Sequence, residues 1–410
     1  MINNLDRPEF KKSGKSKTRL YGEKIMQLSP YWSKILSDCT LCPRSCHVDR
    51  LHGQRGFCGE SAEIRAARAA LYYGEEPVIS GRRGSGAVFF SGCCLGCIYC
   101  QNRSISRPAP DCSISRSEPK TGYLTGNAPA DASAAALSGK KTTAISLSPE
   151  RLSDIFFELE QEGAHNINLV TPEHFVPLII PALENAKNRG LSVPVVYNTG
   201  SYEKAETIRA LEGLVDVWLP DLKYVSSELS ARHTGAADYF QYASAALAEM
   251  VRQCPEPVFS DGSNTIDCAD DADDPLMVRG VLVRHLALPG CAQDSRAVLR
   301  YLHETYGNNI FISIMNQYTP MPQVLKGQTS QAEAIRSYSS PDVHGSDDSR
   351  GINTPGDQHD LQDLCRCLSP EEYDDLINYA IEIGIENGFI QEEGTTSYSY
   401  IPDFDGTGIR

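Results

Sequence analysis

The sequence lacks any apolar run of the roughly 18 residues that a helix needs to span a bilayer. The best candidate, residues 175–183, is short and holds two prolines. The first residues, MINNLDRPEFKKSGKSK, lack the apolar region of a secretory signal. These absences predict a cytoplasmic protein that does not associate with membranes.

An excess of positive charge is also missing. The 410 residues include 38 Lys and Arg against 53 Asp and Glu, which gives a net charge of −15. A surface that binds nucleic acid normally needs a basic face. We therefore expect no nucleic-acid partner.

Three long segments have few apolar residues and little periodicity. They cover residues 112–147, 255–275 and 327–362. Such segments bury too little apolar surface to offset the entropy lost on ordering, so we predict loops or disordered insertions. A lid is the alternative for the first segment, because it directly follows a cysteine-rich loop.

Between these insertions, strand-like runs alternate with helix-like segments. The predicted strands cover residues 86–91, 166–171, 193–198, 215–219, 277–288 and 310–315. The predicted helices cover residues 148–159, 173–189, 202–211, 239–253 and 295–305, and a further helix opens with a capping box at Ser369. This alternation predicts parallel βα units, which both a doubly wound sheet and a partial barrel contain.

Polar residues follow the ends of the predicted strands. They are Cys93, Thr171, Glu173, Asn198, Asp221, Lys223, His285, Asn316 and Gln317. Because the C-terminal ends of barrel strands carry the active site, we expect an α/β fold built on a half-open, partial (β/α)6 TIM-like barrel. The expected organisation is a Cys-rich N-terminal segment over residues 1–75, the barrel over 76–325, and a polar linker with a helical C-terminal extension over 326–410.

The 14 cysteines are clustered, which in a cytosolic chain favours metal ligands or catalytic groups over disulfides. Four lie within the stretch GCCLGCIYCQN. The register Cys94-x2-Cys97-x2-Cys100 would reach a fourth cysteine in a ferredoxin, but Ser104 stands there. The register Cys93-x3-Cys97-x2-Cys100 lets three thiolates hold a [4Fe–4S] cluster and leaves one iron open, as catalytic metal sites require. A zinc knuckle is the alternative, but it lacks a nearby fourth ligand.

A second cysteine set precedes this loop. It consists of Cys39, Cys42, Cys46 and Cys58. Three closely spaced cysteines followed by a fourth, Cys58, farther along the chain predict a site for a zinc ion or an auxiliary iron–sulfur cluster. His47 or His52 could replace one cysteine, and buried free thiols are the alternative to a metal.

The cysteine loop, with Tyr99 just before its last cysteine, resembles the radical S-adenosylmethionine (SAM) signature C-x3-C-x2-C. Its continuation Gln101-Asn102 resembles the pyruvate formate-lyase activating enzymes. Further stretches resemble uncharacterised relatives of those enzymes, in the order CTLCPRSC, NINLVTPEHF, VYNTGSY, LPDLKY, RHLALPG, MNQYTP, FIQEEG and YIPDFDGTG. The resemblance covers nearly all of the chain outside the three insertions.

This resemblance implies a [4Fe–4S] cluster on Cys93, Cys97 and Cys100, with Cys94 as a bystander that stands where Asn is common. The amino and carboxylate groups of SAM would chelate the open iron. An electron from a reductant such as flavodoxin or ferredoxin would cleave SAM, and the resulting 5′-deoxyadenosyl radical would take a hydrogen atom from the substrate. The cofactors carry this chemistry, while the protein supplies ligation and orientation.

The resemblance also assigns roles at the strand ends. Thr171 and Glu173 stand where many relatives have Gly-Gly-Glu to meet the SAM amino group. Asp221 and Lys223 correspond to residues near the SAM carboxylate, the aspartate through a monovalent cation. Tyr197 stands where those enzymes have another aspartate for that cation.

Four further residues are candidates for contacts with SAM. Asn198 lies at the third strand end. Arg284 and His285 are candidates for contacts with the carboxylate or ribose, and a structural ion pair is the equal alternative for Arg284. Gln317 stands where some relatives have a histidine that contacts SAM.

Three functions remain open on the sequence. One is the installation of a glycyl radical on a partner enzyme, by analogy with the activating enzymes. The second is radical modification of a small molecule or a protein side chain. The third is a non-enzymatic electron-transfer protein, although the open ligand position and the polar strand ends argue against it.

Overall fold

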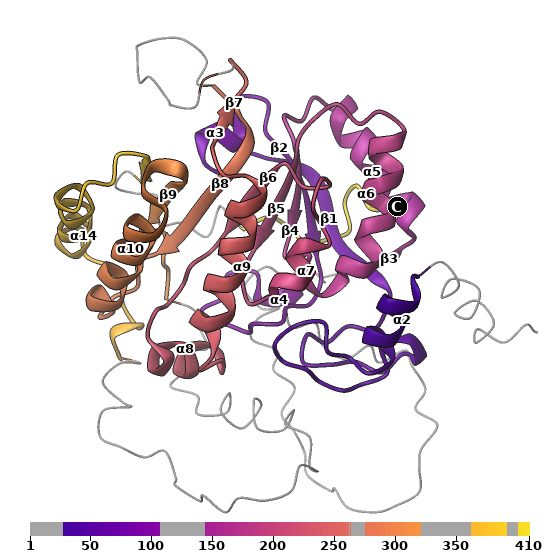
Figure 1. The fold of residues 1–410 in the computed structure, drawn as a ribbon, viewed down its shortest axis with the longest axis horizontal. Coiled ribbons are helices and arrows are strands. Elements are labelled where there is room, and N and C mark those ends of the chain that lie inside the picture. Colours follow the sequence, from indigo (N-terminus) through magenta and orange to yellow (C-terminus); the bar gives the residue numbers. More distant parts are fainter. Residues whose placement is uncertain (1–27, 107–143, 262, 264–274, 321–361, 392–400) are drawn as a thin grey trace, which may run out of the picture.

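The computed structural model describes residues 28–106, 144–261, 263, 275–320, 362–391 and 401–410. Most of the three predicted insertions lies outside the described residues. At their edges lie two short strands, β3 (Ile145–Leu147) and β7 (Val258–Phe259), which fall inside ranges predicted as insertions. The described residues form a mixed α/β structure with a large central sheet (Figure 1).

The central sheet has ten strands in the order β10-β9-β8-β6-β5-β4-β2-β1-β3, with β7 paired to β8. The six predicted strands are β2 (Ser85–Phe90), β4 (Ile167–Val170), β5 (Val195–Thr199), β6 (Val217–Pro220), β8 (Met277–Leu286) and β9 (Phe311–Met315). Neighbours in this series are parallel. The prediction of parallel βα units is therefore confirmed.

Two more strands flank this series and are absent from the sequence prediction. β1 (Ile64–Tyr72) pairs antiparallel with β2, and β10 (Gly388–Ile390) pairs parallel with β9. The sequence of β1, IRAARAALY, is rich in alanine, which is depleted in strands. Pairing with β2 outweighs this weak propensity, and it ties the end of the Cys-rich segment to the sheet.

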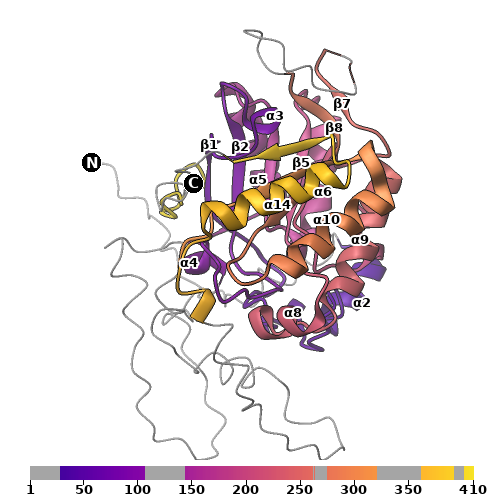
Figure 2. The ribbon, with the colours of Figure 1, turned by 90° about the vertical axis from the view of Figure 1, so that its left-hand side faces the viewer.

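Helices that connect the parallel strands cover one face of the sheet (Figure 1). They are α5 (Pro149–Gln161), α6 (Val176–Asn188), α7 (Ala205–Arg209), α9 (Tyr239–Gln253) and α10 (Ala292–Tyr306). Helices α8 (Ser227–Thr234) and α14 (Pro370–Glu382) complete this layer, and Figure 2 shows α14 beside α10. Short helical segments are α2 (Pro30–Ser37), η1 (Arg50–His52), α3 (Pro77–Ser80), α4 (Arg103–Ser106), η2 (Glu173–Phe175) and η3 (Gly307–Asn309).

Local sequence explains several helix starts. Ser148 caps α5 by accepting a hydrogen bond from the Arg151 N–H, and Ser369 and Glu372 form the predicted capping box of α14. The predicted helix over residues 202–211 is shorter than expected. It begins only at Ala205, because the chain first makes a turn after β5.

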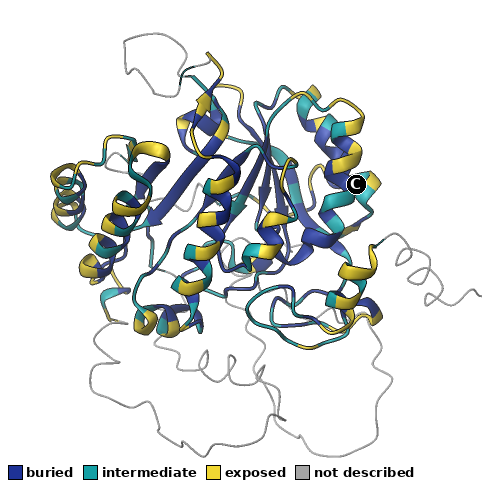
Figure 3. Cartoon of the chain, in the orientation of Figure 1, coloured by how far each residue is buried: buried dark blue, intermediate teal, exposed yellow. Residues whose placement is uncertain are grey.

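The core lies between the sheet and the helix layer. Leu152, Ile155, Phe156 and Leu159 of α5 are buried there, which confirms the predicted apolar face. Figure 3 shows buried strands in the centre and exposed residues on the outward sides of α5 and α9. Among the helices of the described residues, none has the length and apolarity that a membrane span requires.

Substitution of Phe156 by alanine should lower the free energy of unfolding by about 3–5 kcal/mol, because the ring is fully buried and its removal leaves a cavity. Chemical denaturation followed by circular dichroism would measure the change. Ile381→Ala on α14 is the matched control, since this side chain is 67% exposed and should change stability little. Equal effects of the two substitutions would contradict the assigned core.

Candidate functional site at the C-terminal ends of the strands

The cysteine loop begins directly after β2, and two glycines shape it. Gly92 has φ 84° and Gly96 has φ 81°, a region that glycine adopts without strain. A Cβ on Gly92 would lie 2.7 Å from the Cys58 carbonyl oxygen and 2.9 Å from His174 Nε2. A side chain therefore does not fit at Gly92, and the loop can turn tightly beside the N-terminal cysteines.

Three of the four loop cysteines are partly exposed, whereas Cys94 is fully buried. The Leu95 N–H donates to Cys93 Sγ over 3.3 Å, and the Ser106 hydroxyl donates to Cys100 Sγ over 3.5 Å. Burial raises the pKa of Cys93 to about 11 and that of Cys97 to about 12. The thiols are therefore neutral at pH 7, and a bound metal would have to displace their protons.

Glu173 lies just beyond β4 and is 2% exposed. Its Oε1 accepts hydrogen bonds from the Thr199 hydroxyl and the Gly200 N–H, both over 3.3 Å. Its Oε2 has no hydrogen-bond partner among the described residues. Burial raises the pKa of Glu173 to about 7, because no cation offsets the cost of desolvating the carboxylate.

The imidazole of His174 faces the same unpartnered oxygen. Its Nδ1 lies 4.0 Å from Glu173 Oε2, which is beyond hydrogen-bond distance. Nε2 lies 2.7 Å from the Ser91 carbonyl oxygen and must therefore carry the ring proton, since burial lowers the pKa of His174 to about 3. Two buried acceptors, Glu173 Oε2 and His174 Nδ1, thus face each other without a donor.

Two residues near Glu173 have strained backbones. Thr171 has φ 60° and Ser201 has φ 64°, a region that side chains rarely adopt. Ser201 Oγ is buried and lacks a partner within the described part of the chain. Such strain is concentrated at functional sites, where the surrounding structure compensates for it.

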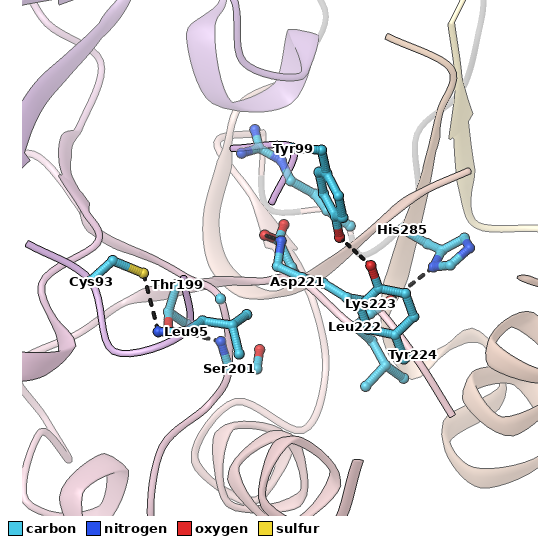
Figure 4. Close-up of polar contacts among 12 residues, drawn as sticks. Cys93, Leu95, Tyr99, Thr199, Ser201, Asp221, Leu222, Lys223, Tyr224 and His285 are labelled. Carbon is cyan, nitrogen blue, oxygen red and sulfur yellow. Dashed lines mark hydrogen bonds and ion pairs between the residues drawn. The ribbon is translucent and has the colours of Figure 1, made fainter. Parts of the chain in front are cut away.

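The Asp221–Lys223 ion pair follows β6 (Figure 4). Burial alone would lower the pKa of Lys223, but Asp221 and then the Cys97 thiol raise it well above its ordinary value. Lys223 therefore stays charged beside the cysteine loop. Its backbone N–H donates to the Tyr239 hydroxyl over 3.0 Å, which fixes the end of the strand.

Gly200 marks the point where three of these elements converge. A Cβ on this residue would lie 3.6 Å from Leu95 Cδ2, 3.8 Å from Glu173 Oε1 and 3.8 Å from Lys223 Cε. Leu95 of the cysteine loop, the carboxylate of Glu173 and the partly buried side chain of Lys223 therefore all lie close to Gly200. Figure 4 shows Cys93 and Leu95 beside Thr199 and Ser201, with Asp221 and Lys223 next to them.

Arg284 lies on the face of the sheet opposite the helices and is ion-paired with Glu75 and Glu76. Its Nε donates to Glu76 over 2.9 Å and 3.1 Å, while Asn198 Nδ2 lies 3.4 Å from Glu75 Oε1. The structure therefore supports the ion-pair alternative for Arg284. Asn198 belongs to the same buried network, which Asn168 joins through a hydrogen bond of 2.7 Å to Glu75.

His285 and Gln317 have structural contacts as well. His285 is 1% exposed and its Nδ1 donates to the Leu222 carbonyl oxygen over 2.8 Å; burial lowers its pKa to about 4. The backbone carbonyl of Gln317 accepts a hydrogen bond from Gln101 Nε2 over 3.2 Å, which connects β9 to the cysteine loop. Both residues therefore hold strand ends in place.

Tyr99 is buried below the loop. Its hydroxyl lies 2.6 Å from that of Tyr224 (Figure 4). The Tyr224 hydroxyl in turn lies 3.1 Å from His233 Nδ1. The ring also contacts Tyr318 edge-on. Tyr99 therefore anchors the loop to the protein core.

The N-terminal cysteine set lies against this loop. The guanidinium of Arg50 is buried and donates to the Ser61 carbonyl oxygen over 2.8 Å, and against the effect of burial the thiols of Cys58 and Cys39 raise its pKa. Cys46 Sγ accepts a hydrogen bond from the Phe57 N–H over 3.2 Å. A metal bound by thiolates carries negative charge, which a buried arginine would offset, so Arg50 fits such a site.

Other contacts of the N-terminal set do not point to a common metal. The Cys94 thiol donates to the Tyr202 carbonyl oxygen over 3.5 Å, and the neighbouring Cys94 lowers the pKa of Cys42 to about 7 against the effect of burial. His47 and His52 are exposed and pair with Asp38 and Asp49, so neither replaces a cysteine. In the described residues, no three His, Cys, Asp or Glu side chains are arranged to hold a single metal ion.

Arg44, absent from the sequence prediction, joins the two cysteine segments. It donates to the carbonyl oxygens of Cys94 and Leu95 over 2.9 Å and 2.8 Å, and to those of Thr234 and Gly235 over 2.9 Å and 2.6 Å. Its guanidinium also lies 3.9 Å from the centre of the Phe57 ring. Its position within the cysteine-rich stretch CTLCPRSC is the only feature of the local sequence that marks Arg44.

Comparisons with known proteins assign no family to the chain. No family model matches it. The chain is 24% identical over 289 residues to a Methanocaldococcus jannaschii protein described as "Uncharacterized protein MJ0674". The aligned region covers 70% of this chain and 67% of that protein. It is also similar to an aldo/keto reductase structure from Brucella melitensis, at 12% identity and a TM-score of 0.21, over 57% of this chain and 91% of that one.

Substitution of Arg44 by alanine should lower the free energy of unfolding by about 3 kcal/mol or more, because four carbonyl groups lose a charged donor. Arg366→Ala is the control, since Arg366 is 45% exposed and its pair with Glu372 should contribute at most about 1 kcal/mol. Denaturant titration measures both. A loss for Arg44→Ala no larger than the control would mean that the two cysteine segments are independent.

Proposed function

We propose that the protein is a radical SAM enzyme, with a [4Fe–4S] cluster on Cys93, Cys97 and Cys100 and SAM bound beside it. When bound, these cofactors supply the reductive cleavage of SAM to a 5′-deoxyadenosyl radical that abstracts hydrogen. The observation that carries the proposal is the convergence at Gly200 of Leu95 from the cysteine loop, Glu173, whose second carboxylate oxygen lacks a partner among the described residues, and the partly buried Lys223.

The donor set fits a cluster with one open iron. Each thiolate of a cubic cluster binds a different iron, so the three sulfurs need not approach as closely as the ligands of a single ion. The Leu95 N–H and the Ser106 hydroxyl already donate to loop sulfurs. Hydrogen bonds of this kind tune iron–sulfur clusters in proteins.

The charges around Gly200 fit the two ends of an amino acid. Glu173 Oε2 and His174 Nδ1 are buried acceptors that lack a donor, as an ammonium group would require. Lys223 supplies a positive charge on the other side, where a carboxylate would bind, and Asp221 holds its ammonium group in place. The strained turns at Thr171 and Ser201 bring Glu173 and Gly200 together.

We assign the finer fold, a partial (β/α)6 barrel of the radical SAM type, on the same basis. Six successive strands are parallel, and the candidate residues follow their C-terminal ends. Arg284 and Asn198 take supporting roles in this proposal, because their side chains are occupied by Glu75 and Glu76. The substrate and reductant follow from the resemblance alone: a glycyl-radical enzyme, and a flavodoxin or ferredoxin.

Anaerobically reconstituted protein should convert SAM to 5′-deoxyadenosine under reducing conditions, and Cys97→Ala should not. Chromatography would measure the product, and electron paramagnetic resonance would record whether SAM shifts the cluster signal. Cys254→Ala is the matched control, because Cys254 is a buried thiol outside the loop. A stable cluster that ignores SAM would contradict the proposal and favour an electron-transfer protein.

Substitution of Glu173 by glutamine should weaken SAM binding by about 10- to 100-fold, because a charge-assisted hydrogen bond becomes a neutral one. In the unsubstituted protein, affinity should fall as the pH drops below about 7, where Glu173 gains a proton and loses its charge. Calorimetric titration between pH 6 and pH 8 would show both effects, with the range chosen around roughly one unit on either side of that pKa. Affinity for SAM that is unchanged in Glu173→Gln would remove this residue from the site.

A further inference from the structure

A second buried carboxyl group, that of Glu203, is connected to Glu173 through the Thr199 hydroxyl. Neither the family resemblance nor the proposed chemistry assigns a role to Glu203. It follows the strained Ser201 in the turn between β5 and α7, and it is 1% exposed. Its Oε1 lies 2.6 Å from the Thr199 hydroxyl and its Oε2 lies 2.8 Å from the Tyr197 hydroxyl. Both oxygens are therefore in contact with hydroxyl groups.

The hydroxyl of Thr199 lies between the two carboxylates. It is 2.6 Å from Glu203 Oε1 and 3.3 Å from Glu173 Oε1, and its oxygen accepts a hydrogen bond from the Ser201 N–H over 3.0 Å. A threonine hydroxyl has one proton to donate and two lone pairs. It cannot donate to both carboxylates, so if both contacts are hydrogen bonds, one of the two carboxyl groups must donate to it.

The surroundings decide which carboxyl group carries the proton. Glu173 also receives the Gly200 N–H, a backbone donor that favours its charged form. Glu203 receives only hydroxyl groups, and its negatively charged or ionisable neighbours, Glu173 and Cys42, disfavour its charge. Burial, and then the neighbouring Glu173, raise the pKa of Glu203, and burial raises that of Glu173.

Other charged groups also face this pair. Asp221 faces Glu173 and disfavours its charge, whereas the hydrogen bonds from the Gly200 N–H and the Thr199 hydroxyl favour it. His174 is neutral, and its Nδ1 is too far from Glu173 Oε2 to accept a proton from it in this geometry. The proton therefore belongs on Glu203, which lacks a backbone donor such as the Gly200 N–H that Glu173 receives.

We propose that Glu203 is a positioning residue held as the neutral carboxylic acid, which donates to Thr199 so that Thr199 donates to a charged Glu173. The proton order is Glu203 Oε1–H to Thr199 Oγ1–H to Glu173 Oε1. This order leaves Glu173 Oε2 ionised and open toward a bound cation. The assignment of that cation as the SAM ammonium group rests on the proposed function, whereas the position of the proton does not.

Two isosteric variants test the position of the proton. Glutamine at position 203 can donate to Thr199 and accept from Tyr197, as the neutral acid does, and glutamine at position 173 removes the other carboxyl group. Infrared difference spectra of wild type minus each variant, at pH 7 without SAM, would show which substitution removes a carboxylic-acid band. We expect the band to be lost in Glu203→Gln and kept in Glu173→Gln, with both variants folded by circular dichroism.

Two spectroscopic results would overturn the proposal: loss of the band only in Glu173→Gln, or a band that neither variant removes. SAM affinity gives the second readout. We expect Glu203→Gln to bind SAM within about twofold of wild type, because its hydrogen bonds reproduce those of the acid. A marked gain in affinity would mean that an ionised Glu203 had kept Glu173 neutral, which also overturns the proposal. Wild type that fails to bind SAM would reject the proposed function and leave the infrared result standing.

Discussion

Parallel strands bring all their C-terminal ends to one edge of the sheet. The rest of this structure depends on how the polar and charged groups at that edge are accommodated in a partly buried environment. The cysteine loop, Glu173, Thr199 and the Asp221–Lys223 pair meet there because β2, β4, β5 and β6 are neighbours. Burial removes much of the water from these groups, so a buried charge needs a partner or a shifted pKa. Lys223 has Asp221 as its partner, whereas Glu173 has only hydrogen-bond donors on one oxygen.

The same constraint operates on the other face of the sheet, with the opposite outcome. Arg284 forms ion pairs with both Glu75 and Glu76, and the amide nitrogens of Asn168 and Asn198 donate to Glu75 Oε1. Each charged group of this cluster therefore has a partner inside the protein, although Asn168 Oδ1 has none among the described residues. Glu173, by contrast, is a buried carboxylate without an arginine or lysine partner in the described residues, and we place the candidate site around it and Gly200.

The N-terminal cysteine segment extends the same edge. Arg44 crosses from this segment to the carbonyl groups of the cysteine loop and of the end of α8. Glu60 accepts a hydrogen bond from Ser91 over 2.8 Å at the start of the loop. The two cysteine sets therefore form one continuous region, although the sequence presents them as separate motifs.

The sequence alone determined the features that depend on local spacing. The alternation of apolar runs defined six parallel strands, the Ser369 capping box defined a helix start, and the loop spacing separated Cys93, Cys97 and Cys100 from Cys94. Only the tertiary structure decided the partners of buried groups. Arg284 lies 209 residues from Glu75, Arg44 lies 191 residues from Gly235, and the Glu173–Thr199–Glu203 chain joins two strand ends. Such contacts follow from how strands and turns pack, because a buried charge is satisfied by whichever group the fold brings to it, and no local pattern encodes that choice.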